Sequence, residues 1–499
     1  MHSECIYTQS PARKTFLVPL DPTRPPPKML LLTLTRPSIR MTIRHLRSPL
    51  YFVALAALLG SARSGAQTLS EPAIQAIVNE RVTSGRAVGL VVATMDRGKT
   101  RVYTAGSSGT DGVRLDGNTV FEIGSITKVF TAALLADMVA RGEVQLDDPI
   151  SKYLPAAVKI PTRNGKQITL VDLSTQFSGL PRLPANMTPK DQRNPYADYS
   201  VDQLYAFLSG YELTRDIGER YEYSNLGVGL LGHVLALRAG KSYEQLLVER
   251  IFEPLGMKDT RIVLSSGMSR RLARGHDETG APTANWDLPT LAGAGALRST
   301  ANDMLKFLAA NLDSARTPVG RALATTRVAR RDVPGGPLQI GLGWHILSPF
   351  GQPIVWHNGG TGGYRAFIGL DHRNQRGVVV LSNKSISPDD IGIHILEPRA
   401  PLTPAPKARK EVAIDPAVLD SYVGVYELSP AFSITITREG AGLALQATGQ
   451  ERLQLFAESP TEFFLKIVDA QIVFEKDASG KVTRLVLHQA GQSMPGVKK

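Results

Sequence analysis

A serine and a lysine stand three positions apart in the segment FEIGSITK, residues 121–128. Side chains at this spacing lie on one face of a helix, so the Lys128 amine can reach the Ser125 hydroxyl. The backbone N–H groups of a helix start also attract an anion. Ser125 is the only serine of the sequence followed by lysine at this spacing. The pair predicts an activated nucleophile, and the competing interpretation is a polar helix start with a solvated lysine.

A tyrosine and an asparagine follow about a hundred residues later, in the segment YEYSN at 221–225. The Tyr223 phenol can transfer a proton if a neighbouring cation lowers its pKa, and the Asn225 amide can hold Lys128 or orient a substrate carbonyl. Among the 14 tyrosines, only Tyr223 precedes an asparagine by two positions. A core tyrosine beside a helix cap would give the same pattern.

A third pattern is the glycine-rich segment WHNGGTGGY at 356–364. Glycines at this density let the backbone approach a ligand closely. The N–H of Gly360 could then stabilise an oxyanion together with the N–H of Ser125. His357 is the only one of nine histidines followed two positions later by glycine. Taken alone, the segment is a glycine-rich turn after a strand.

Together and in this order, the three motifs resemble the serine hydrolase family that includes class C β-lactamases, D-Ala-D-Ala carboxypeptidases and related esterases. The resemblance extends over roughly residues 70–395, with framing segments ITL at 168–170, SGLP at 178–181, GAGAL at 293–297 and LSNK at 381–384. It implies an α/β (α+β) fold of the β-lactamase/transpeptidase type, in which a mainly antiparallel sheet is flanked by helices and a helical subdomain. It implies neither a metal nor an organic cofactor.

The resemblance also implies a role for each matching residue. Ser125 would be the acylated nucleophile, and Lys128 and Tyr223 would share the acid and base work. Asn225 would orient the acyl side chain of the substrate. The remaining residues that the resemblance places along the substrate site are His357, Asn358, Gly359, Gly360 and Asn383.

Two departures from the family pattern bear on the substrate. Many relatives read Thr-His-Thr-Ser-Gly-Leu where this chain has TQFSGL at 175–180. True β-lactamases of this family carry Lys-Thr-Gly where this chain has His357-Asn358-Gly359. A neutral histidine offers a substrate carboxylate one hydrogen bond in place of a full charge. We therefore expect peptide or ester substrates more than efficient β-lactam hydrolysis.

The first 66 residues read as a leader and signal peptide. Basic residues precede the uncharged run LYFVALAALLG at 50–60, and small residues follow up to Ala66, the expected cleavage site. The start of translation is either Met1 or Met41. The single cysteine, Cys5, lies in this segment, so the mature chain would lack disulfides. We expect a periplasmic or secreted protein that meets a membrane only during export.

Charge and motif content exclude several other functions. Residues 1–66 hold 9 of the 57 Lys and Arg residues and 2 of the 45 Asp and Glu residues, so the formal charge falls from +12 to +5 without them. This small excess predicts no nucleic-acid partner.

The histidines show no metal-ligand spacing, and no G-x-S-x-G pentad is present. The expected partner is a small-molecule or peptide substrate, with D-Ala-D-Ala-type peptides or β-lactams first and small esters, the substrates of a carboxylesterase, second. A non-catalytic penicillin- or peptidoglycan-binding protein is the second hypothesis, and the oligomeric state is open.

Sequence patterns divide the rest of the chain into a hydrolase domain at 67–397, a Pro-rich linker at 398–416 and a small β domain at 417–499. The hydrolase domain shows strand patterns at 88–95 and 378–381, and helical patterns at 125–141, 204–208, 226–238 and 243–252. Alternating patterns in the last part predict an antiparallel barrel or sandwich. Its expected strands are 422–426, 432–437, 443–446, 453–456, 463–467, 472–474 and 482–487.

Overall fold

The computed structural model describes residues 68–405, 409–429, 432–448, 452–466, 469–489 and 492–499. The predicted leader and signal peptide lie outside the described residues. Within these ranges, no helix combines the length and the apolar character needed to cross a membrane.

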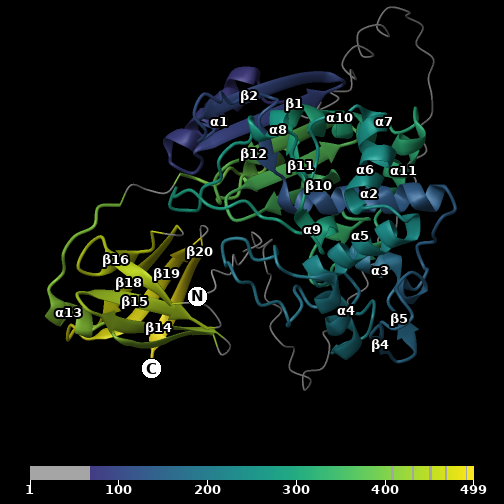
Figure 1. The fold of residues 1–499 in the computed structure, drawn as a ribbon. Coiled ribbons are helices and arrows are strands. Elements are labelled where there is room, and N and C mark those ends of the chain that lie inside the picture. Colours follow the sequence, from purple (N-terminus) through teal and green to yellow (C-terminus); the bar gives the residue numbers. More distant parts are fainter. Residues whose placement is uncertain (1–67, 406–408, 430–431, 449–451, 467–468, 490–491) are drawn as a thin grey trace, which may run out of the picture. The chain divides into compact units, whose positions relative to one another are not determined.

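An eight-stranded antiparallel sheet forms the centre of the first part of the chain (Figure 1). Its strand order is β2-β1-β12-β11-β10-β9-β8-β7, so the first strand pairs with the last one in sequence. The strands predicted at 88–95 and 378–381 are confirmed as β1 and β12. The bounds are β1 Gly89–Asp96, β2 Lys99–Gly106, β7 Arg331–Asp332, β8 Gln339–Ile340, β9 His345–Leu347, β10 Ile354–Gly360, β11 Arg365–Asp371 and β12 Arg376–Ser382.

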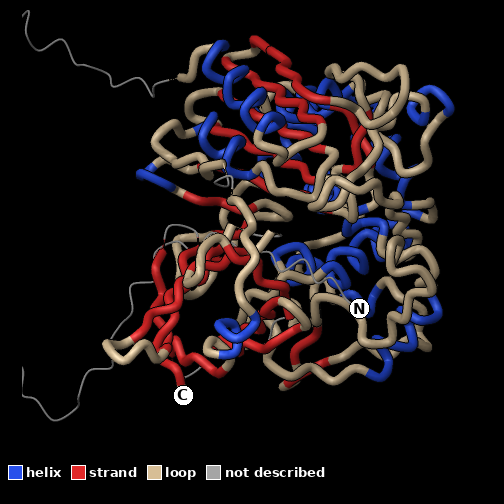
Figure 2. Tube along the Cα trace, turned by 90° about the vertical axis from the view of Figure 1, so that its left-hand side faces the viewer, coloured by secondary structure: helices blue, strands red, loops and turns tan. Residues whose placement is uncertain are grey.

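Helices cover both faces of this sheet, because its central strands are apolar on both sides (Figures 1 and 2). Leu90 and Val92 of β1 belong to a core shared with α1 and α12. Val91 and Ala93 point the other way, into the larger core that contains α2 and α10. The helices of this part are α1 Glu71–Thr83, α2 Thr127–Ala140, α3 Leu170–Thr175, α4 Val201–Gly210, α5 Asn225–Ala239, α6 Tyr243–Leu247, α7 Glu253–Leu255, α8 Ser266–Ser269, α9 Ala292–Gly295, α10 Ala301–Leu312, α11 Pro318–Thr326 and α12 Asp389–Leu396.

Three of the predicted helices appear as α2, α4 and α5, and the fourth differs in form. The segment at 243–252 is α6 followed by a π-helical turn, Val248–Phe252. Short elements complete this part of the chain. They are the 3₁₀ turns η1 Gly124–Ile126, η2 Ile150–Lys152 and η4 Pro349–Gly351, and the two-stranded sheets β3 Val120–Glu122 with β6 Arg298–Thr300 and β4 Thr162–Arg163 with β5 Lys166–Gln167.

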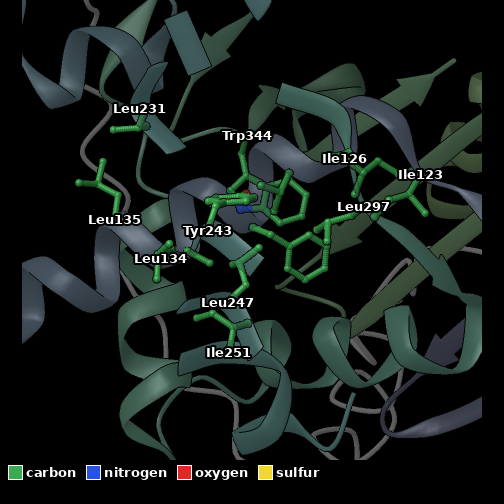
Figure 3. Packing of buried hydrophobic residues seen from close by; sticks show 14 of the residues in the cluster. Ile123, Ile126, Leu134, Leu135, Leu231, Tyr243, Leu247, Ile251, Leu297 and Trp344 are labelled. Atoms are coloured by element: carbon green, nitrogen blue, oxygen red, sulfur yellow. The ribbon is translucent and has the colours of Figure 1, made fainter. Parts of the chain in front are cut away.

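Helix α2 lies in the middle of the larger core (Figure 3). It is apolar around most of its circumference, as expected of a helix surrounded by protein. Phe130 packs against Phe252 and Phe307, and Leu134 and Leu135 are fully buried. Because interiors are close-packed, a helix in this position cannot shift without disturbing its neighbours.

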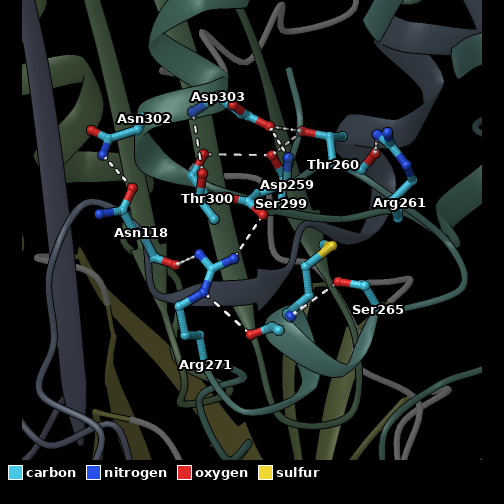
Figure 4. A network of polar contacts seen from close by, with 12 residues as sticks. Asn118, Asp259, Thr260, Arg261, Ser265, Arg271, Ser299, Thr300, Asn302 and Asp303 are labelled. Atoms are coloured by element: carbon cyan, nitrogen blue, oxygen red, sulfur yellow. Dashed lines mark hydrogen bonds and ion pairs between the residues drawn. The ribbon is translucent and has the colours of Figure 1, made fainter. Parts of the chain in front are cut away.

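A polar network holds the strand pair that leads into η1 (Figure 4). Strand β3 ends two residues before Gly124 and pairs with β6. Asp303, at the start of α10, is buried and accepts hydrogen bonds from Asp259 N at 2.7 Å and from Thr260 Oγ1 at 3.0 Å. Thr260 Oγ1 in turn lies 2.8 Å from Ser299 Oγ on β6. Asp303 thereby fixes β6, the partner of the strand β3 that leads into η1.

The last part of the chain forms a closed eight-stranded barrel, one of the two predicted forms (Figure 2). The sequence predicted seven strands and missed the eighth, β20, because Pro495 and Gly496 interrupt its pattern. Val412 and Ile414, expected in the linker, pack against the barrel core. The bounds are α13 Pro416–Asp420, β13 Gly424–Ser429, β14 Phe432–Glu439, β15 Gly442–Ala447, β16 Arg452–Ala457, β17 Glu462–Phe464, β18 Ala470–Lys476, β19 Val482–Gln489 and β20 Gln492–Lys498.

Replacing Asp303 tests the polar network. Asp303→Ala leaves buried donors unpaired, and we expect it to lower the free energy of unfolding by about 3 kcal/mol. Asp313→Ala is the matched control, because Asp313 is half exposed and its partner Arg316 more so, and it should cost less than about 0.5 kcal/mol. Denaturant unfolding measures both variants. Equal effects of the two would contradict the role given to Asp303.

Candidate active site

Backbone packing holds the 3₁₀ turn that carries Ser125 against strand β10. A Cβ on Gly359 would lie 1.9 Å from the carbonyl oxygen of Ile123. Gly124 has a φ of +48°, and a Cβ there would lie 2.6 Å from the nitrogen of Gly360. Only glycines allow so close an approach. Ser125 itself is partly exposed to solvent.

The Lys128 amine lies within hydrogen-bonding distance of three oxygen atoms. Its Nζ is 3.0 Å from Ser125 Oγ, 2.8 Å from Asn225 Oδ1 and 2.7 Å from the carbonyl oxygen of Ala294 in α9. It also lies 4.8 Å from the centre of the Tyr223 ring. The structure thus brings together the serine, lysine, tyrosine and asparagine of the first two motifs.

No carboxylate compensates the Lys128 amine among these contacts, and the side chain is fully buried. Burial, and then the charge of nearby Arg182, hold the pKa of the Lys128 amine well below its ordinary value of 10.5. Burial disfavours the charged form because the ammonium loses its hydration. Lys128 is therefore poised to lose its proton far more readily than a surface lysine.

The loop that carries Tyr223 is fixed from two sides at the start of α5. Ser224 caps this helix, accepting a hydrogen bond from Gly227 N at 2.8 Å and donating one to the carbonyl oxygen of Pro181 at 2.6 Å. Gln176 Oε1 accepts a hydrogen bond from Ser224 N at 2.8 Å. Gln176 is buried, and its backbone carbonyl also accepts a hydrogen bond from Glu222 N at 2.9 Å, so it holds the loop on both sides of Tyr223.

Asn225 is engaged at both ends of its amide. Its oxygen faces Lys128, and its Nδ2 donates to the hydroxyl of Tyr196 at 2.9 Å. The Tyr196 ring packs on Trp286 with centroids 5.4 Å apart. This arrangement fixes the amide with its oxygen toward the lysine. Of the two tasks predicted for Asn225, holding Lys128 is the one seen here.

His357 points toward the same region from strand β10. Its buried ring lies 6.3 Å from the Tyr223 ring and stacks on His345 with centroids 4.8 Å apart. Burial, then His345 and Lys128, hold the pKa of His357 well below its ordinary 6.5, and burial and then Lys128 lower the pKa of His345 to about 4. Both imidazoles are neutral at neutral pH, as expected for His357 from the sequence.

Two residues predicted along the substrate site lie elsewhere. Successive side chains of a strand point to opposite faces, so Asn358 points away from His357 and donates to Asp389 at the start of α12. Asn383 is fully buried, and its amide bonds Gly89 N and the carbonyl oxygens of Ser107, Ser108 and Arg274. Its side chain is thus used to join backbone segments. The glycine-rich segment is also not a turn up to Gly360, because 354–360 form β10.

Sequence reasoning missed four residues of this region. Ala294 lies within the framing segment GAGAL, and Arg182 directly follows the framing segment SGLP. Only the fold, however, brings the Ala294 carbonyl oxygen to Lys128. Tyr196 and His345 carried no local signal. Arg182 is exposed, and its guanidinium lies 5.4 Å from the Tyr223 ring. Over the described residues, no group of three or more His, Cys, Asp or Glu side chains could hold a metal ion.

A nucleophile beside a desolvated amine, a phenol and a glycine-backed strand is the arrangement of a serine hydrolase that forms an acyl-enzyme. Residues 74–396 match the beta-lactamase family model, and the chain belongs to this family of serine hydrolases. Residues 408–496 match a separate domain of unknown function, DUF3471.

Several characterised proteins are similar to this chain. The D-alanyl-D-alanine-carboxypeptidase/endopeptidase AmpH of Escherichia coli K12 is 32% identical over 359 residues, which cover 68% of this chain and 92% of AmpH. Penicillin-binding protein 4* of Bacillus subtilis is 30% identical, with 72% and 83% coverage. The crystal structure of a class C beta-lactamase from Rhodobacter sphaeroides matches with a TM-score of 0.57 at 28% identity, covering 65% of this chain and 98% of that one.

The environment of Lys128 predicts the pH dependence of Ser125 reactivity. We propose that the unprotonated Lys128 amine is the base, so that reactivity is lost as the pH falls through the lowered pKa and is level above it. We expect the rate of labelling by a fluorophosphonate to reach its plateau well below pH 10.5. Rates measured from pH 5 to 11, corrected with Ser125→Ala, test this. A rate still rising tenfold per pH unit near pH 10 would contradict it.

Proposed function

We infer that the protein is an exported hydrolase that cleaves D-Ala-D-Ala-type peptides, and β-lactams less efficiently, through an acyl-enzyme on Ser125. The observation that carries this proposal is the set of three oxygen atoms around the Lys128 amine. The similarity to AmpH and to penicillin-binding protein 4* supports the choice of substrate.

The three partners of Lys128 suit a base that works without rearrangement. A neutral amine has two N–H groups and one lone pair. Asn225 Oδ1 and the Ala294 carbonyl oxygen can only accept, so they take both N–H groups and leave the lone pair for the Ser125 hydroxyl. After the proton arrives, the ammonium donates to all three oxygens. The neutral amine and the ammonium therefore each keep all their hydrogen bonds without any movement of the three oxygen atoms.

The reaction then proceeds in two balanced halves. Ser125 Oγ attacks the carbonyl carbon while its proton passes to Lys128, and the N–H groups of Ser125 and Gly360 stabilise the oxyanion. The C–N or C–O bond breaks as the leaving group takes a proton from the Lys128 and Tyr223 pair. Water then attacks the ester, giving up its proton to the same pair, and releases the acid and the free serine.

The third motif favours peptides and esters over β-lactams. His357 is neutral at neutral pH, so β10 offers a hydrogen-bonding group where lactamases of the family have a fixed charge. Hydrolysis of small carboxylic esters is the second candidate, since it needs no charge recognition. A purely binding role is less favoured, because such a protein has no use for a buried amine beside a serine.

Trapping the acyl-enzyme tests the proposal. A fluorescent penicillin and a fluorophosphonate should each add one label to the wild type and none to Ser125→Ala, as measured by intact mass. No adduct with either probe would support the binding protein instead. Steady-state rates on a D-Ala-D-Ala peptide, nitrocefin and p-nitrophenyl butyrate then rank the substrates.

Loss of the base should slow turnover sharply. Lys128→Ala is expected to reduce kcat/KM on the best of these substrates by about 100-fold or more, the scale of losing a general base. Lys241→Ala is the matched control, because Lys241 is a half-exposed lysine whose ion pair with Glu249 lies at the surface. A Lys128→Ala enzyme that keeps most of its activity would overturn the role given to Lys128.

Export is supported by the sequence of residues 41–66, a basic segment followed by an apolar run and small residues. Expression of the full chain in a Gram-negative host should give a periplasmic protein whose first residue is at or near Gln67. N-terminal sequencing of the periplasmic fraction measures this. A full-length chain in the cytosol would contradict export.

A further inference from the structure

One permanently charged side chain near the nucleophile has no role in the steps above. Arg182 is exposed, and its guanidinium lies 5.4 Å from the centre of the Tyr223 ring. Lys128 lies 4.8 Å from the same ring, so the arginine shares a neighbour with the buried amine. Its positive charge acts to lower the pKa of the Lys128 amine and of the Tyr196 and Tyr221 hydroxyls.

The position of Arg182 is fixed although its side chain is open to solvent. Its carbonyl oxygen accepts hydrogen bonds from Asn225 N at 3.0 Å and from Leu226 N at 3.2 Å. The preceding residue, Pro181, accepts from the Ser224 hydroxyl. These bonds tie the backbone of Arg182 to the segment that contains Tyr223 and Asn225, so the side chain starts from a fixed point beside this segment.

No acid within the described chain neutralises this guanidinium. Over these residues its side chain makes no hydrogen bond or ion pair, and its guanidinium faces the Tyr223 ring. The acid of the neighbouring loop, Glu222, is already paired with Arg215 and lies 3.7 Å from Arg220. An unpaired guanidinium beside a nucleophile is a site for an anion, because its planar fork matches a carboxylate with two parallel hydrogen bonds.

The other groups around the nucleophile leave this task open. Lys128 is buried, directs its amine at Ser125 and carries no charge when it acts as the base. His345 and His357 are neutral at neutral pH. The Arg365 guanidinium lies close to Gly360, but it is buried and donates to the carbonyl oxygens of Thr361 and Tyr364. Arg182 is then the exposed arginine beside the Tyr223 ring that can meet a charged substrate group with a charge of its own.

We propose that Arg182 binds a carboxylate of the substrate and so sets a preference for anionic over neutral acyl donors. This inference rests on the proposed function, since it concerns the substrate of the same Ser125 site. The carboxylate belongs either to the acyl part or to the leaving group, and the two sources are distinguished by experiment.

Two matched substrate pairs measure the preference. The first pair is 4-nitrophenyl adipate monoester and 4-nitrophenyl hexanoate, which differ by a carboxylate at the end of the acyl chain. The second pair is a blocked Lys-D-Ala-D-Ala tripeptide and its C-terminal amide, which differ by a carboxylate on the leaving group. The readout is the ratio of kcat/KM for the anionic member to kcat/KM for the neutral one, in which any general effect on Lys128 cancels.

Arg182→Ala should lower this ratio by about tenfold or more in one of the two pairs, as expected for a lost charged hydrogen bond. Arg182→Lys should restore part of it, because the charge returns without the fork. Arg316→Ala, which removes an exposed arginine of a surface ion pair, should leave the ratio and the basal rate unchanged. The pair that responds identifies the source of the carboxylate.

Ratios unchanged within twofold in both pairs, in an Arg182→Ala enzyme that still forms the Ser125 adduct, would overturn the proposal while leaving the proposed function intact. A wild-type protein that cleaves none of the four substrates and forms no adduct would overturn both. Adduct formation and substrate cleavage by the wild-type protein therefore show which of the two proposals has failed.

Discussion

The chemistry of this protein depends on a single amine kept out of water without a counter-ion. Lys128 meets a hydroxyl, an amide oxygen and a peptide carbonyl, none of which carries a charge. A carboxylate in any of these places would stabilise the ammonium and remove the base. The rest of the site serves to keep this neutral cage in place, from the Tyr196 contact that sets the Asn225 amide to the packing that immobilises α2.

Strand β10 shows how one short segment serves two sides of the sheet. Its glycines let η1 approach within backbone contact, and His357 faces the tyrosine, while Asn358 turns to the helix on the reverse face. Asp389, which accepts a hydrogen bond from the Asn358 amide, is partly buried, and burial raises its pKa to about 6. The reverse face thus supports the strand that borders the nucleophile, although it contains no reacting group.

Sequence reasoning located Ser125, Lys128, Tyr223 and Asn225 because their signals are local spacings that survive without knowledge of the fold. The sequence interpretation places Asn358 beside His357 along the site, but successive side chains of strand β10 point to opposite faces, and Asn358 contacts Asp389. It could not find Tyr196 or Arg182, which reach the site from irregular segments. The layered fold of the hydrolase part followed from the family resemblance, and the barrel from the alternating apolar pattern of its strands. The eighth strand, β20, was missed because Pro495 and Gly496 interrupt its pattern.

The pairing of β1 with β12 has a consequence for how the molecule comes into being. The sheet joins residues near 90 to residues near 380, and the nucleophile turn leans on a strand that emerges more than two hundred residues after it. Such distant pairings form late in folding. A nascent chain therefore contains Ser125 and Lys128 long before it contains strand β10, which packs against them. The surroundings of Lys128 and Ser125 are therefore complete only after this part of the chain has been synthesised.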